Sequence, residues 1–134
     1  MNLNAVMDAI GDRLGIIAGL RIYDYPADKI AAPAAVLGLP DDITYDDAYG
    51  RGMDRMSLPL LLVVGRGSDR VARDDLAAYA SGSGTRSIKQ VLESGTYVAF
   101  DTLRVTRVEF DSLRIAGVDH LAALFDLDIA GSGS

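Results

Sequence analysis

The sequence contains no cysteine and no tryptophan, and its single histidine is His120. Disulfides, thiolate nucleophiles and zinc–thiolate sites are excluded because each of them requires cysteine. A serine–histidine–aspartate triad would have to be built on His120, which falls at the start of an expected strand, on its outward face. We therefore interpret His120 as a surface or interface residue. The sequence has few of the residues that usually carry catalysis, because it has no cysteine and one histidine. We expect no enzymatic activity and no cofactor.

Clustered basic charge and long apolar runs are also scarce. The formal net charge is −6, and the two lysines, Lys29 and Lys89, are far apart in the sequence. A protein that grips nucleic acid needs clustered lysine and arginine, so we expect no sequence-specific nucleic-acid partner. No apolar run approaches the roughly 20 residues of a membrane helix, and the N-terminus lacks the basic and apolar regions of a secretory signal. We expect no membrane association.

What is present is typical of one soluble globular domain. The chain has 134 residues, of which 49% are hydrophobic and 24% charged, enough to bury a core without disulfides. We assign residues 1–130 to a single domain and residues 131–134, Gly-Ser-Gly-Ser, to a flexible tail.

Hydrophobic spacing predicts a succession of helices and strands. The first expected helix covers residues 3–14, capped by Asn2 or Asn4 and closed by a left-handed Gly15. Ser68 caps a second helix, whose expected buried stripe is Val71, Ala72, Leu76 and Tyr79. Thr85 can cap a third, shorter helix. The expected strands cover residues 21–25, 34–39, 56–64, 97–110 and 120–129. In the fourth strand the apolar positions change from odd to even near Thr106–Arg107, which predicts a β-bulge.

The longest apolar run is Met56–Val64, MSLPLLLVV. Its Leu60–Val64 half is expected to be buried on both faces. Its Met56–Pro59 half is expected at a sheet edge, because Pro59 cannot donate a ladder hydrogen bond. The strands are grouped and do not alternate with helices, so we predict an α+β fold: a mixed, mainly antiparallel sheet, helices packed on one face, and a long hairpin joining strands 34–39 and 56–64.

The excursion of that hairpin, residues 41–54, is acidic and carries two tyrosines. It reads either as a loop or as a twisted exposed ribbon, and long ordered excursions usually have a functional reason. Several of its residues are of types found in protein interfaces. The interface candidates are Asp41, Asp42, Tyr45, Asp46, Asp47, Tyr49, Arg51, Met53 and Arg55.

Ligand binding remains open as an alternative. The aspartates of residues 41–54 could hold a hard cation, although they do not match the calcium-loop spacing. GRGSDR and SGSGTRS could receive an anion at a helix entry, but neither matches a phosphate-loop pattern. Asp126 and Asp128 share a strand face without the aromatic platform of a sugar site. Because none of these segments matches a known ligand pattern, we predict no metal site and no catalytic site among them.

Three long segments, VLGLPDDITYDDAYGRGMDRMSLPLLLVVGRGSDRVARDDLAAY, IKQVLESGTYVAF and VEFDSLRIAGVDHLAALFDLDIAG, resemble the tail terminator proteins of long-tailed (siphovirus-type) bacteriophages, particularly those of actinobacteria. The resemblance covers nearly the whole chain and lies in its overall pattern, without a short catalytic motif. It implies a structural virion protein that forms a hexameric ring on the head-proximal end of the tail tube.

Such a ring ends tube polymerisation and provides the docking surface for the head connector, and the virion is assembled in the host cytoplasm. The partners implied are other copies of the chain, the tail tube protein and head–tail connector proteins, with DNA passing through the lumen. A net-negative wall would let DNA pass without sticking. The alternatives are another neck protein, namely a head–tail connector or a tail completion protein, or a metal- or anion-binding enzyme that uses the Asp41–Asp54 loop.

Overall fold

The computed structural model describes residues 2–23, 33–40, 42–45, 53–66, 70–115 and 117–132. They form an α+β fold, as predicted. In chain order the elements are α1 (Leu3–Leu14), β1 (Arg21–Tyr23), β2 (Ala34–Leu37), β3 (Ile43–Thr44), β4 (Met53–Arg66), α2 (Arg70–Ala80), α3 (Ile88–Glu93), β5 (Thr102–Ile115) and β6 (Val118–Ser132).

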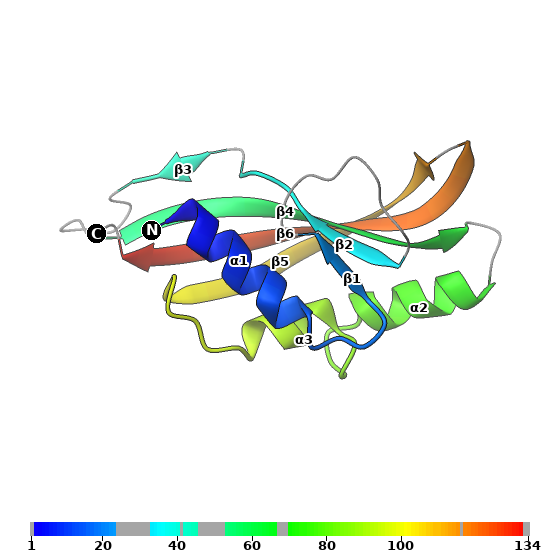
Figure 1. The fold of residues 1–134 in the computed structure, drawn as a ribbon, viewed down its shortest axis with the longest axis horizontal. Coiled ribbons are helices and arrows are strands. Elements are labelled where there is room, and N and C mark those ends of the chain that lie inside the picture. Colours follow the sequence, from blue (N-terminus) through cyan, green and yellow to red (C-terminus); the bar gives the residue numbers. More distant parts are fainter. Residues whose placement is uncertain are drawn as a thin grey trace.

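The strands form one mixed, mainly antiparallel sheet in the order β1-β2-β4-β6-β5, and β3 pairs with β4. The β1–β2 pair is parallel and every other pair is antiparallel. β4 and β6 run along the long axis of the molecule, and the tight β5–β6 hairpin curls upward at the end away from both termini (Figure 1). The predicted fold class is confirmed.

One face of the sheet carries the core. Met56, Leu58, Leu60 and Leu62 of β4 are at most 1% exposed, and they alternate with more exposed residues, as a strand buried on one face requires. Side chains from all three helices belong to the same cluster. In Figure 1, α2 and α3 lie below the sheet and α1 lies in front. The helices therefore shield one face, as expected.

α1 begins and ends for local reasons. The Asn2 side chain accepts a hydrogen bond from the Ala5 N–H at 3.1 Å, which confirms the predicted N-cap. The predicted left-handed end at Gly15 is wrong: Gly15 has φ −60° and continues the helical turn. The chain reverses instead through Gly19, which has φ 79°, a conformation that favours glycine.

The prediction that Met56–Pro59 lies at an edge is wrong. Pro59 is opposite Asp126 of β6, and its carbonyl accepts the Gly38 N–H at 2.9 Å on the other side. Because the N–H and C=O of one strand residue point to the same side, the missing N–H of Pro59 faces the gap between β2 and β3. A proline is tolerated in this central strand because no strand needs its donor there.

Element boundaries shift elsewhere. Val71 of α2 is 64% exposed, so its predicted place in the buried stripe is wrong, whereas Ala72, Leu76 and Tyr79 are buried. α3 is capped by the Ser87 side chain and not by Thr85, because Ser87 accepts the Gln90 N–H at 3.1 Å.

The last hairpin is longer than its sequence pattern suggested. β5 begins at Thr102, so residues 97–100 are not strand, and it continues to Ile115, beyond the expected end at residue 110. The register shift between Val105 and Arg107 confirms the predicted bulge. Residues 131 and 132, part of the expected tail, belong to β6.

Candidate functional site

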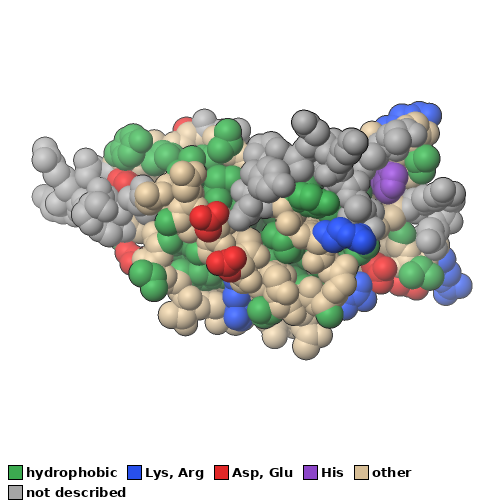
Figure 2. Space-filling model, viewed as in Figure 1, with side chains coloured by type: hydrophobic (Ala, Val, Ile, Leu, Met, Phe, Trp, Pro, Cys, Tyr) green, Lys and Arg blue, Asp and Glu red, His purple; other side chains and the backbone are tan. Residues whose placement is uncertain are grey.

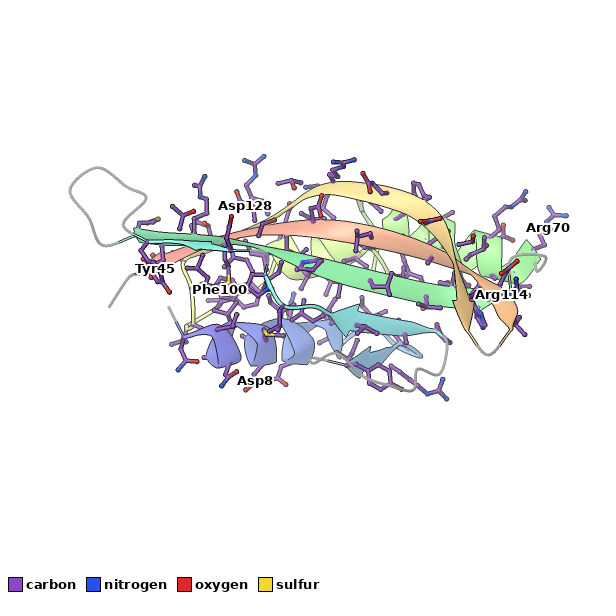
Figure 3. The ribbon with its side chains drawn as sticks, turned by 90° about the horizontal axis from the view of Figure 1, so that it is seen from above. Asp8, Tyr45, Arg70, Phe100, Arg114 and Asp128 are labelled. Atoms are coloured by element: carbon purple, nitrogen blue, oxygen red, sulfur yellow. The ribbon has the colours of Figure 1, made fainter. Side chains whose placement is uncertain are left out.

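The described part of the acidic excursion is a short ribbon at one end of the sheet. Ile43 and Thr44 of β3 pair with Met56 and Arg55, while Met53 on the same β4 segment pairs with Ser132 of β6. Tyr45 directly follows β3, and its side chain lies at that end of the molecule (Figure 3). Of the two expected forms, loop or ribbon, the described residues adopt the ribbon.

The predicted interface residues fall into two groups. Asp42 and Arg55 are exposed, Tyr45 is 69% exposed and Met53 is half-buried. Because pairing with β4 holds β3 in the sheet, Tyr45 projects from a supported position. The remaining candidates, Asp41, Asp46, Asp47, Tyr49 and Arg51, lie outside the described residues.

Charges near this ribbon are engaged within the chain. Arg55 Nε lies 3.8 Å from Asp128 Oδ1 on the neighbouring strand. Asp54, which the sequence groups with the exposed aspartates, is 4% exposed and has a polar partner. No buried side-chain nitrogen or oxygen in the described ranges lacks a hydrogen-bond partner. This part of the ribbon is therefore internally satisfied and presents Asp42 and Tyr45 outward.

The geometry of the described residues gives little support to the alternative ligand-binding sites. Within the described ranges, no three histidine, aspartate or glutamate side chains gather as metal ligands. In the SGSGTRS turn the Gly84 N–H donates to Gln90 Oε1 at 3.0 Å, so the turn closes on its own helix. His120 Nδ1 lies 3.0 Å from the Val118 carbonyl, a contact that fits a structural role.

A groove of about 700 Å³, which the sequence did not suggest, runs between α1 and residues 96–99. Figure 2 shows acidic side chains on the surface of α1, and Asp8 and Asp12 line the groove beside the apolar side chains of Ile16 and Val98. Both apolar side chains are largely exposed.

The groove walls are tied together by Arg13 and Tyr97. Arg13 Nε donates to the Val91 carbonyl at 2.8 Å, and Arg13 Nη2 donates to Ser94 Oγ at 3.1 Å. The Tyr97 hydroxyl donates to the Leu92 carbonyl at 2.6 Å, and burial raises the pKa of Tyr97. Arg13 therefore holds α1 against α3 and the residue that follows it, and Tyr97 holds the other wall of the groove against α3.

A smaller pocket of about 320 Å³ opens at the β-bulge of β5. Val105 and Arg107 flank the register shift, and both line the pocket together with Lys89 of α3 and Phe125 of β6. Sequence reasoning found the bulge from the change of apolar phase. It could not find the pocket, which depends on α3 lying beside that strand.

Comparison with known proteins adds no family. A scan of protein-family models and a search of curated proteins find no match for this chain. No helix in the described ranges is long and apolar enough to cross a membrane. The fold and the exposed ribbon therefore define a small α+β protein with a candidate interaction surface, and its function is taken up as a proposal.

Proposed function

We propose that this chain is a tail terminator protein, a structural virion component that assembles as a hexameric ring on the head-proximal end of a phage tail tube. The ring ends tube polymerisation and offers a docking surface to the head connector. Three features support the proposal: the resemblance over nearly the whole chain, the α+β fold, and a hairpin excursion that presents exposed side chains. The observation that carries it is the supported, exposed Tyr45.

A ring of identical subunits needs two different patches, one on each side of every contact. The β3 ribbon supplies a compact patch with an aromatic side chain and acidic neighbours in sequence. Aromatic residues supply much of the binding energy at protein interfaces, because a large rigid surface is buried at low entropic cost. A net charge of −6 suits a ring through which DNA passes, since like charges repel.

The test removes the aromatic side chains of the excursion. The variant Tyr45→Ala with Tyr49→Ala is expected to keep the melting curve of the wild type, because Tyr45 is 69% exposed and contributes little to the core. The variant is expected to lose ring assembly on tail tubes, observed by negative-stain images and native mass. Val71→Ala, which truncates a 64% exposed side chain on α2, is the control and should assemble normally.

The wild-type chain should form rings near six subunits, at high concentration or when tail tubes are supplied. A tail terminator is expected to bind tail tubes, whereas a head connector is expected to bind on the head side. A tail-tube binding assay therefore distinguishes the two. A strictly monomeric wild type that also fails to bind tail-tube protein would refute the proposal. Normal assembly of the double-tyrosine variant would show that the excursion is not an interface.

A further inference from the structure

The pocket at the β5 bulge, called the bulge pocket below, combines an apolar interior with a cationic rim. Its volume is about 320 Å³. Phe125 is 2% exposed and Val108 is half-buried. The pocket is lined by Ala80, Lys89, Arg104, Val105, Thr106, Arg107, Val108 and Phe125, a set with three cationic residues and no carboxylate.

The strand edge beside this pocket is already occupied. The Val105 N–H donates to Glu93 Oε2 at 2.8 Å, and the Val105 carbonyl accepts from Lys89 Nζ at 3.3 Å. Lys89 and Glu93 are themselves paired at 2.6 Å. An exposed edge strand normally invites strand addition. Here the Lys89 and Glu93 side chains of α3 take the edge hydrogen bonds of Val105, so a partner at this position has to bind through side chains placed in the pocket.

The three cationic residues of the rim differ in whether they already form an ion pair. Lys89 is paired with Glu93, and Arg107 is paired with Glu109 and lies 3.9 Å from Asp126. Arg104 is exposed and forms no direct ion pair or hydrogen bond with any residue in the described ranges. Its charge acts on Glu93 through space, helping to lower the pKa of that carboxyl. An apolar interior next to an exposed guanidinium without a direct partner fits an aromatic side chain that has a carboxylate close by.

The same chain carries a segment of that chemistry. Tyr45 stands within Asp-Asp-Ile-Thr-Tyr-Asp-Asp, residues 41–47, and both Asp42 and Tyr45 are exposed. β3, which Tyr45 follows, pairs with β4, whereas the pocket lies on β5 at the other side of the sheet, with β4 and β6 between them. The segment and the bulge pocket are therefore separate patches, and a contact between separate patches of identical copies is heterologous.

We infer that the bulge pocket of one copy receives Tyr45 and Asp42 of a second copy, with Arg104 facing the Asp42 carboxylate. This inference rests on the proposed function, for which it names the two sides of the subunit contact. A heterologous contact repeats from copy to copy and closes when its rotation closes, as a ring requires.

The experiment uses two complementary full-length variants. The tip variant, Tyr45→Ala with Asp42→Asn, keeps its pocket but lacks the occupant. The pocket variant, Arg104→Glu, keeps its tip but carries a repulsive charge at the rim. All three positions are exposed, so the tip variant should keep the melting curve of the wild type. Arg104 lies opposite Asp128, so Arg104→Glu should lower the melting temperature slightly without preventing folding. A second pocket variant, Ala80→Leu, fills the cavity without changing charge.

The tip variant is labelled with ¹⁵N and titrated with unlabelled pocket variant. The unmodified pocket of the labelled copy can then bind the unmodified Tyr45 segment of the unlabelled copy. We expect saturable amide shifts at Lys89, Thr106 and Val108, and a stable one-to-one complex that grows no further. Introducing Arg104→Glu, or separately Ala80→Leu, into the labelled copy should weaken binding about tenfold or more. Titration with unlabelled tip variant is the control, and it should give no shifts.

Absence of shifts up to about 1 mM of titrant, equal shifts in the control, or shifts confined to residues 109–115 would each overturn the inference. Its failure is distinguishable from that of the proposed function. Pocket binding without ring assembly on tail tubes would retain the contact and reject the terminator. Rings without pocket binding would retain the terminator and reject the contact.

Discussion

Leu62 of β4 gives the sharpest test of how the sheet is oriented. Its side chain is 0% exposed, and it lies between Ala35 of β2 and Ala123 of β6. Leu62→Ala removes about three methylene equivalents, which at about 0.8 kcal/mol each is about 2.4 kcal/mol of transfer free energy. A cavity adds to this cost unless neighbours relax into it.

Relaxation is limited at this position. The two flanking side chains within the sheet are alanines, which have no rotamers that could fill the space. We therefore expect Leu62→Ala to lower the free energy of unfolding by roughly 2–5 kcal/mol, towards the upper part of that range. This is a large share of the roughly 5–15 kcal/mol typical of a domain.

Leu61→Ala is the matched control, because it is the same substitution one residue earlier. Leu61 points to the opposite face of the sheet and is half-buried, so its loss should cost about 1 kcal/mol. Urea unfolding measures both variants, and the Leu62→Ala midpoint should fall by roughly 1–3 M with an unchanged slope. Equal losses for the two variants would refute the assignment of faces.

Three further predictions concern the hairpin, the strand edge and the ring. Gly38→Ala would place a Cβ 2.9 Å from Pro59 Cγ, so it should cost about 1–3 kcal/mol in urea unfolding, and adding Pro59→Ala should recover part of the loss; equal stability of both variants would contradict this. Partial burial opposes ionisation of Glu93, but hydrogen bonds from Lys89 and the Val105 N–H lower its pKa below the ordinary 4.5. The ionised Glu93 carboxylate therefore stabilises the folded protein above about pH 4.5, and this contribution is lost as pH falls through the lowered pKa. In thermal melts between about pH 3 and 7, Glu93→Gln should reduce the loss of stability at the acid end. Tyr45→Ala with Tyr49→Ala should spare the melting temperature and remove assembly on tail tubes, as described above.

Local patterns predicted much of the chain because they depend on neighbours in sequence. The spacing of Val6, Ile10 and Leu14 determines one buried helix face, and Asn2 caps the helix through a residue three positions away. The alternation in β6 determines which side chains face the core. The phase change before Arg107 marks the bulge, because an inserted residue reverses the facing of every residue that follows.

Features that depend on partners distant in sequence were not predictable in this way. Pro59 looked like an edge residue, since the sequence cannot tell that β2 ends and β3 begins opposite its missing donor. Val71 fits the helical stripe but faces solvent, because the sheet lies on another side of α2.

The same distinction between local patterns and contacts of distant segments holds for the candidate site. Hydrophobic period and side-chain chemistry are properties of the chain, so they were enough to predict the fold class, most of the core faces and the acidic, tyrosine-bearing character of residues 41–47. Tertiary structure decided that Tyr45 is held outward on a paired ribbon, that Asp54 is buried, and that α3 covers the edge of β5 beside a cationic pocket. The physical reason is that burial, charge pairing and pockets arise between segments brought together by folding, and their spacing along the chain does not encode which segments meet.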